Sequence, residues 1–142
     1  MIKFSKLLKQ LIFSSSNKEK TKLIIDYFNN VSSLEAGYTI AALTNNLKFK
    51  NIKAGSVKNL IKSKVDSTLF DLSYEYVGDL ADTISLIWNR NEGIANKNYS
   101  LLEIINNLNS KSINIEKFII DFLNNNKVDE RWAFIKLLLG GF

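Results

Sequence analysis

The segment Ser100-Leu-Leu-Glu-Ile-Ile-Asn-Asn-Leu108 decides the fold class of this chain. Ser100 and Glu103 form the capping-box pattern, in which a serine hydroxyl and a glutamate carboxylate accept hydrogen bonds from the free amides at a helix start. The apolar residues that follow recur at the spacing of one helix face. Together these signals predict an α-helix that begins just after Ser100.

The same serine–glutamate pattern occurs twice more, in Ser16-Asn-Lys-Glu19 and Ser32-Ser-Leu-Glu35, each time before an apolar helical stripe. Further helices are predicted wherever apolar residues keep helical spacing: 4–12, 57–65, 66–76, 80–88, 115–123 and 130–139. No alternating strand pattern, hairpin dipeptide or internal repeat is present. The sequence therefore predicts one all-α domain over residues 1–142, with about seven or eight helices.

Breaks between helices are also predicted. Gly78 interrupts the apolar pattern, and we favour a structural role for Gly78 and Asp79, as a helix break followed by an amide cap. Asp66 is a further expected N-cap, and Gly140-Gly141 a stop signal. The polar stretch 89–98 is predicted as a loop.

The opening segment, residues 1–13, is basic and amphipathic, with apolar residues at i, i+3, i+4, i+7 and i+8. Packing on its own domain is the commoner use of such a helix, and a membrane-surface helix is the alternative. Lysines interrupt any signal-peptide core, and no apolar run approaches the ~20 residues of a membrane span. We expect a cytoplasmic protein with no membrane partner.

The composition excludes several kinds of chemistry. The 142 residues include no His and no Cys, which excludes Ser-His and Cys-His nucleophile pairs, thiolate or imidazole metal sites, and disulfides. Hydrophobic residues make up 46% of the chain, enough to build a core. Catalysis would need carboxylates, lysines, hydroxyls or a hard cation bound by oxygens. We expect no catalytic residue, no metal ligand and no cofactor in this chain.

Positive charge is concentrated in the first half of the chain. The formal net charge is +5. Residues 1–64 contain twelve lysines and three acids, a balance of +9, whereas residues 65–142 contain seven basic and eleven acidic residues, a balance of −4. This asymmetry predicts one basic face.

The basic residues are densest between residues 48 and 64, where six lysines occur with no acid among them: Lys48, Lys50, Lys53, Lys58, Lys62 and Lys64. Such a run suits the neutralisation of nucleic-acid phosphates. Gly55-Ser56 leads into the helix of Lys58, whose first amides could also face an anion. A lysine surface that only keeps the protein in solution explains the same segment equally well.

Four acids have the spacing of one helix face, if the helix were continuous: Asp71, Glu75, Asp79 and Asp82. Carboxylates placed this way could bind Mg²⁺ or act as an acid/base pair, as in a small carboxylate enzyme. A solvated face, or a partner for the basic half of the same domain, is the interpretation we favour. The aromatic residues fall on helical stripes and favour a core rather than a base-stacking platform.

Two stretches of the sequence resemble a known family. Tyr76-Val-Gly-Asp-Leu-Ala-Asp-Thr83 resembles the Val-Gly-Asp-Leu-Ala-Glu-Thr signature of bacterial and archaeal ATP-dependent DNA ligases. Arg131-Trp-Ala-Phe-Ile-Lys-Leu-Leu-Leu-Gly-Gly-Phe142 resembles the segment that closes the N-terminal domain of these ligases. Ala41-Ala-Leu-Thr44 and the segment 14–28 fit the same order, so the resemblance spans nearly the whole chain.

The resemblance implies an all-α DNA-binding domain that grips duplex DNA around a nick and does no chemistry itself. ATP and Mg²⁺ would serve the parent enzyme, whose nucleotidyltransferase domain carries a Lys-x-Asp-Gly motif. That motif and the oligonucleotide-binding domain are absent from residues 1–142, so we expect the chain to be the front part of a longer ligase.

The resemblance also implies particular DNA contacts. Lys20, Arg131 and Lys136 match basic positions of the family, and Gly140 and Gly141 match a turn where the backbone can approach DNA. With the six lysines named above, these residues form the expected interface.

The leading hypothesis is therefore sequence-independent binding of duplex or nicked DNA, which positions a nick for an ATP-dependent DNA ligase in repair or replication. The expected partners are the DNA of a bacterial nucleoid and the catalytic domains of the parent ligase, with the chain itself a monomer. The alternative is a helical protein-interaction module whose basic surface is incidental and which binds a partner helix in an apolar groove.

Overall fold

The structure is a bundle of short helices that begin, in most cases, at a capping side chain. The computed structural model describes residues 1–89 and 97–142, and these residues contain nine α-helices and no strand. The predicted all-α class is confirmed, with slightly more helices than expected. The helices are α1 (Ile2–Phe13), α2 (Asn17–Phe28), α3 (Ser33–Leu43), α4 (Ala54–Lys62), α5 (Ser67–Val77), α6 (Leu80–Ile87), α7 (Leu101–Asn109), α8 (Ile115–Asn125) and α9 (Val128–Leu139). Most of the predicted loop 89–98 lies outside the described residues.

The predicted helix starts are confirmed by hydrogen bonds. Three serine hydroxyls, of Ser16, Ser32 and Ser100, each accept from the amide three residues later. In α7 the pattern is complete, because the Glu103 carboxylate also accepts from the amide of Ser100 at 3.0 Å. These bonds satisfy amides that a helix leaves without an internal partner, so each helix start is set locally.

The break between α5 and α6 has the predicted chemistry. Gly78 ends α5 in the left-handed conformation with φ of 78°, which glycine adopts without the steric cost of a β-carbon. Asp79 then caps α6 by accepting from the amide of Asp82 at 2.9 Å. The structural role expected for both residues is confirmed.

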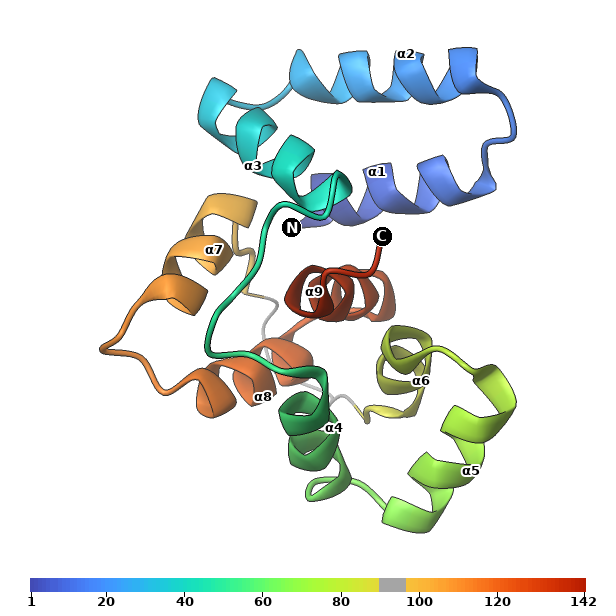
Figure 1. The fold of residues 1–142 in the computed structure, drawn as a ribbon, viewed down its shortest axis with the longest axis vertical. Coiled ribbons are helices and arrows are strands. Elements are labelled where there is room, and N and C mark those ends of the chain that lie inside the picture. The colour runs from blue at the N-terminus through green and yellow to red at the C-terminus, as the bar shows by residue number, and fades with distance from the viewer. Residues whose placement is uncertain (90–96) are drawn as a thin grey trace.

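The centre of the molecule is α9, around which α1, α6, α7 and α8 are arranged (Figure 1). Its buried residues cover more than half of its circumference, as expected for a helix packed against several others: Arg131, Ala133, Phe134, Ile135, Leu137 and Leu138. Within this core the rings of Phe122 and Phe134 stack with their centroids 4.0 Å apart. Helix α9 therefore organises the hydrophobic core.

The first three helices cover one end of the molecule (Figure 1). Helix α1 buries Phe4, Leu7 and Leu8, so the opening helix packs on its own domain as favoured above. Helix α2 lies outside α1, and α4 and α5 lie at the opposite end of the molecule (Figure 1). Among residues 1–89 and 97–142, no helix has the length and apolarity needed to cross a membrane.

Candidate nucleic-acid interface

The connection between α3 and α4, residues 44–53, presents lysines on an anchored backbone. Its apolar residues Leu47, Phe49 and Ile52 pack against the core, and Phe49 is buried. The basic residues that alternate with them are exposed: Lys48, Lys50 and Lys53. Because a buried or partly buried side chain lies beside each exposed lysine, the three lysines extend from an anchored strip of chain rather than from a free loop.

The start of this connection is fixed by a turn. Asn45 has φ of 58°, a left-handed conformation that asparagine tolerates better than most residues. The amides of Asn46 and Leu47 both donate to the carbonyl of Ala41, at 2.8 and 3.0 Å. These bonds close the end of α3 and set the direction in which the lysine-bearing segment leaves it.

Helix α4 begins at Ala54, three residues earlier than the predicted start at Val57. Its N-cap is Lys53, whose side chain makes no capping bond, so the sequence carries no local signal for this start. A β-carbon at Gly55 would meet no atom within 4 Å, which shows that the first turn of α4 is open. The first amides of α4 therefore lie uncapped by a side chain and next to Lys53 in the sequence.

Two lysines of α4 are turned toward α5. The Lys58 Nζ lies 4.8 Å from the centroid of the Tyr74 ring, a cation–π distance. The Lys62 Nζ lies 2.8 and 3.0 Å from the two carboxylate oxygens of Asp71. Part of the basic surface is thus neutralised within the domain.

Four lysines of the segment 48–64 remain exposed and form no ion pair with any described residue: Lys48, Lys50, Lys53 and Lys64. Since Lys64 lies two residues after the end of α4, these four lysines flank the helix on both sides along the chain. We define them as the lysine surface. It is the part of the predicted interface with charge available for a partner.

The other two lysines of the predicted interface lie on different elements. Lys20 is half-buried on α2, at the opposite end of the molecule from α4 (Figure 1). Lys136 lies on α9, where its Nζ is 2.7 Å from the Asp79 carboxylate and its side chain is only 18% exposed. The structure therefore brings neither residue to the lysine surface.

The pairing of Lys136 with Asp79 connects the end of α9 to the start of α6. Burial raises the pKa of Asp79, but the hydrogen bonds from Lys136 and from the Asp82 amide outweigh that effect and hold the pKa below its ordinary value. Asp79 is thus an N-cap and an ion-pair partner at once. The sequence indicated only the first of these roles.

Arg131 is an interior residue, contrary to its expected place in the interface. It is 4% exposed, and its Nη1 donates to the carbonyl of Trp88 at 2.6 Å. Its side chain lies inside the protein because α9 is surrounded by other helices. A guanidinium held this way is withdrawn from a DNA backbone outside, so we remove Arg131 from the contact set.

Gly140 and Gly141 end α9, as the stop signal predicted. Gly140 has φ of 70°, and its amide donates to the carbonyl of Lys136 at 2.9 Å. A β-carbon at either glycine would meet no atom within 4 Å, so the backbone is open on that side. Their expected approach to DNA stays a prediction.

The acidic set does not form one site. Gly78 breaks the helix, so Asp71 lies on α5 while Asp79 and Asp82 belong to α6. Asp71 is paired with Lys62, which supports its interpretation as a partner for the basic half of the domain. Within the described part of the chain, no group of three or more acids could bind a metal ion together.

The anchoring of the lysine surface was not foreseen. Leu47-Lys-Phe-Lys50 alternates apolar and basic residues, and this period of two was the available signal that one side of the connection is buried. Leu47, Phe49 and Ile52 pack against the core and are not part of the lysine surface, yet they determine where the exposed lysines point.

Comparison of the chain with protein-family models, with curated proteins and with solved structures gave no match.

Proposed function

We propose that this chain binds duplex DNA without sequence preference, through its phosphates. In this proposal the lysine surface supplies the main contacts, with Lys58 and Lys62 at its edge and Lys20, Lys136 and the turn at Gly140-Gly141 as secondary contacts. Phosphate contacts position a protein on DNA but carry no base information, so the binding is independent of sequence.

The observation that supports the proposal most directly is the arrangement of the residues 47–53. Exposed lysines alternate with side chains that pack against the core, so the backbone that carries the lysines is held in place before DNA binds. Lysines held in this way lose less conformational entropy on binding than lysines on a free loop. A lysine surface that served only solubility would not require such anchoring.

We further propose that the DNA held here is nicked and that an ATP-dependent DNA ligase, of which this chain is the front part, seals it on the bacterial nucleoid. This part of the proposal is supported by the resemblance of residues 76–83 and 131–142 to the ligase family. The chemistry, with its ATP and Mg²⁺, would belong to the following domains. The chain alone would bind DNA and catalyse nothing.

A salt titration tests the DNA-binding proposal. Fluorescence anisotropy with labelled duplexes of two unrelated sequences, each intact and nicked, should give similar affinities for both sequences. Each phosphate contact on duplex DNA contributes about −0.9 to the slope of log K against log salt, so four lysines predict a slope of roughly −3 to −4. Absence of duplex binding at low salt, or affinity indifferent to salt, would contradict the proposal.

Two triple variants distinguish the contribution of the lysine surface to DNA binding from the contribution of the net charge of the chain. Replacing Lys48, Lys50 and Lys53 by alanine should make the salt slope shallower by about 3. Replacing Lys97, Lys111 and Lys117, which are exposed in the other half of the chain, removes the same charge. The second variant should change the slope little. Equal losses in both variants would show that binding follows total charge and not the lysine surface.

The ligase part has its own test, which needs no binding assay. In the gene, codons for Arg-Val-Gly directly after Phe142, followed by a Lys-x-Asp-Gly motif, would support it. Any other continuation would leave DNA binding in place and remove the ligase assignment.

A further inference from the structure

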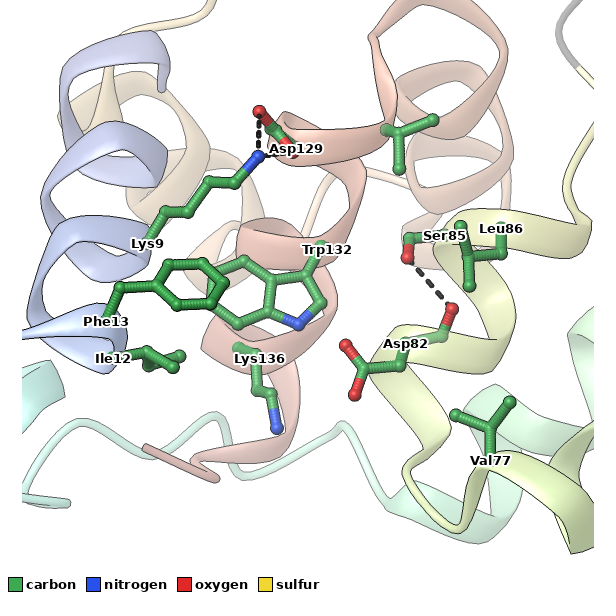
Figure 2. Close-up of a pocket in the computed structure, with 11 residues that line it drawn as sticks. Lys9, Ile12, Phe13, Val77, Asp82, Ser85, Leu86, Asp129, Trp132 and Lys136 are labelled. Atoms are coloured by element: carbon green, nitrogen blue, oxygen red, sulfur yellow. Dashed lines mark hydrogen bonds and ion pairs between the residues drawn. The ribbon is translucent and has the colours of Figure 1, made fainter.

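A second surface of the molecule is an apolar groove between α1 and α6. Figure 2 shows its walls and floor: Ile12 and Phe13 come from the end of α1, Leu86 comes from α6, and Trp132 of α9 lies between them. The groove has a volume of about 470 Å³. Ile12, Phe13 and Leu86 are 63%, 79% and 68% exposed, so both sides of the groove present large apolar side chains to solvent.

The charges around the groove are paired, with one exception. At one end the Lys9 Nζ lies 3.0 Å from Asp129, and the Lys136 Nζ is held by Asp79 at 2.7 Å. The carboxylate of Asp82 forms no hydrogen bond and no ion pair with any described residue. Among the described residues, the Asp82 carboxylate is therefore the one charge of the groove without a partner, in a domain whose net charge is positive.

A donor group accompanies this carboxylate. The indole nitrogen of Trp132 points to the side of the groove on which Asp82 lies (Figure 2), and it makes no hydrogen bond within the described residues. A cationic side chain entering here would be attracted by the Asp82 carboxylate, whereas the face of the Trp132 ring already has the Lys136 Nζ at 6.0 Å from its centroid. Both lysines of the groove are paired with carboxylates, so they offer DNA phosphates no free positive charge.

The size of the groove limits its occupant. Eleven residues line it, whereas each side of a standard protein–protein interface has about 20–30 residues. A stable dimer of this chain would need a larger surface. An amphipathic helix of another protein fits better. Such a helix inserts a few apolar side chains into a groove, and a charged side chain of the helix can pair with a charge at the edge of the groove.

We propose that the groove docks an amphipathic helix of a partner protein, whose apolar side chains lie among Ile12, Phe13 and Leu86 and whose arginine or lysine pairs with Asp82. The site is separate from the lysine surface and does not depend on DNA binding. Of the proposed DNA contacts only Lys136 lines the groove, so the chain would bind a protein in the groove while the lysine surface binds DNA.

The probe for this proposal is a synthetic helical peptide of roughly 18 residues, long enough to hold some helix in water. It has leucines at i, i+4 and i+7 and an arginine at i+3, so that all four side chains share one face. A matched peptide has glutamine in place of the arginine. Isothermal titration calorimetry should show binding of the arginine peptide, with at least a threefold weaker affinity for the glutamine peptide.

Three variants locate the binding. Phe13→Glu and Leu86→Glu should each weaken the arginine peptide at least tenfold, and far-ultraviolet circular dichroism should show an unchanged fold because both side chains are exposed. Asp82→Asn should weaken the arginine peptide but leave the glutamine peptide unaffected, since only the former loses an ion pair. Lys50→Ala, on the lysine surface, should affect neither peptide.

Several results would overturn the proposal. These are no binding up to about 1 mM peptide, a millimolar limit that corresponds to roughly −4 kcal/mol, equal binding to the Leu86→Glu variant, or an undiminished preference for the arginine peptide after Asp82→Asn. Sedimentation equilibrium provides the remaining test. A concentration-dependent dimer that Leu86→Glu abolishes would assign the groove to a second copy of this chain instead.

Discussion

The α3–α4 connection and helix α9 both carry basic residues, but the fold uses them in opposite ways. In the connection, Lys48 and Lys50 are exposed because Phe49, which lies between them, is buried. In α9, Arg131 is buried against the carbonyl of Trp88, and Lys136 is paired with Asp79. The position of an element, at the edge or at the centre, decides whether a positive charge is available to a partner or stabilises the interior.

The largest expected effect on stability is at Arg131 in the central helix α9. Arg131→Ala should lower the free energy of unfolding by about 3 kcal/mol, because it removes buried packing and a hydrogen bond donated by a charged group. Urea denaturation followed by circular dichroism measures it. Arg131→Met, which keeps much of the packing, should lose less. If Arg131→Ala is as stable as Lys50→Ala, the distinction between centre and edge fails.

A smaller effect is expected where α6 meets α9. Asp79→Ala removes an N-cap and leaves Lys136 without its partner, at a cost of about 1–2 kcal/mol by urea denaturation. Asp79→Asn keeps an acceptor for the amide of Asp82 and should cost less than the alanine variant. Equal stability of the wild type and the alanine variant would mean that the Lys136 pair and the cap contribute nothing measurable.

The same pair predicts a dependence on pH. The folded state holds the pKa of Asp79 below its ordinary value of 3.8, so the stabilisation is complete above that value and is lost as the pH falls through the folded-state pKa. Stability measured from pH 6 down to about pH 2 should therefore fall more steeply in the wild type than in Asp79→Asn. Parallel curves for the two proteins would exclude this origin of the acid sensitivity.

The smallest effect on stability is expected in the α3–α4 connection. The triple alanine variant of Lys48, Lys50 and Lys53 should unfold within about 0.5 kcal/mol of the wild type, because exposed lysines without ion pairs contribute little. Its loss of DNA affinity would then be a loss of contacts and not of folding. A destabilisation above about 1 kcal/mol would show instead that these lysines support the connection.

Features set by neighbouring residues could be predicted from the sequence, whereas features set by the packing of distant helices could not. The starts of α2, α3, α5 and α7 were predictable because a cap acts within three residues, and Gly78 was predictable because a left-handed helix end favours glycine. The start of α4 was not, because Lys53 provides no side-chain cap. A helix start can be predicted when its cap lies within a few residues in the sequence.

Tertiary partners left no such signal. Lys136 and Asp79 are 57 residues apart, and Arg131 and Trp88 are 43 residues apart, so their pairing depends on how α9 is packed. The sequence also did not indicate that Phe13 and Leu86 are exposed. It shows apolar residues near two helix ends, but not whether another helix covers them. The lysine surface was identified by its density of charge, whereas its anchoring needed the fold.

The central place of α9 also bears on how the protein is made. Helices α1 to α8 precede it in the chain, yet the core that they enclose includes Phe134, Ile135 and Leu137 of α9. At usual rates of translation the ribosome takes on the order of ten seconds to reach Val128. During that time the apolar side chains of the earlier segments lack the α9 side chains that cover them in the folded domain, so the core is completed only after α9 has emerged.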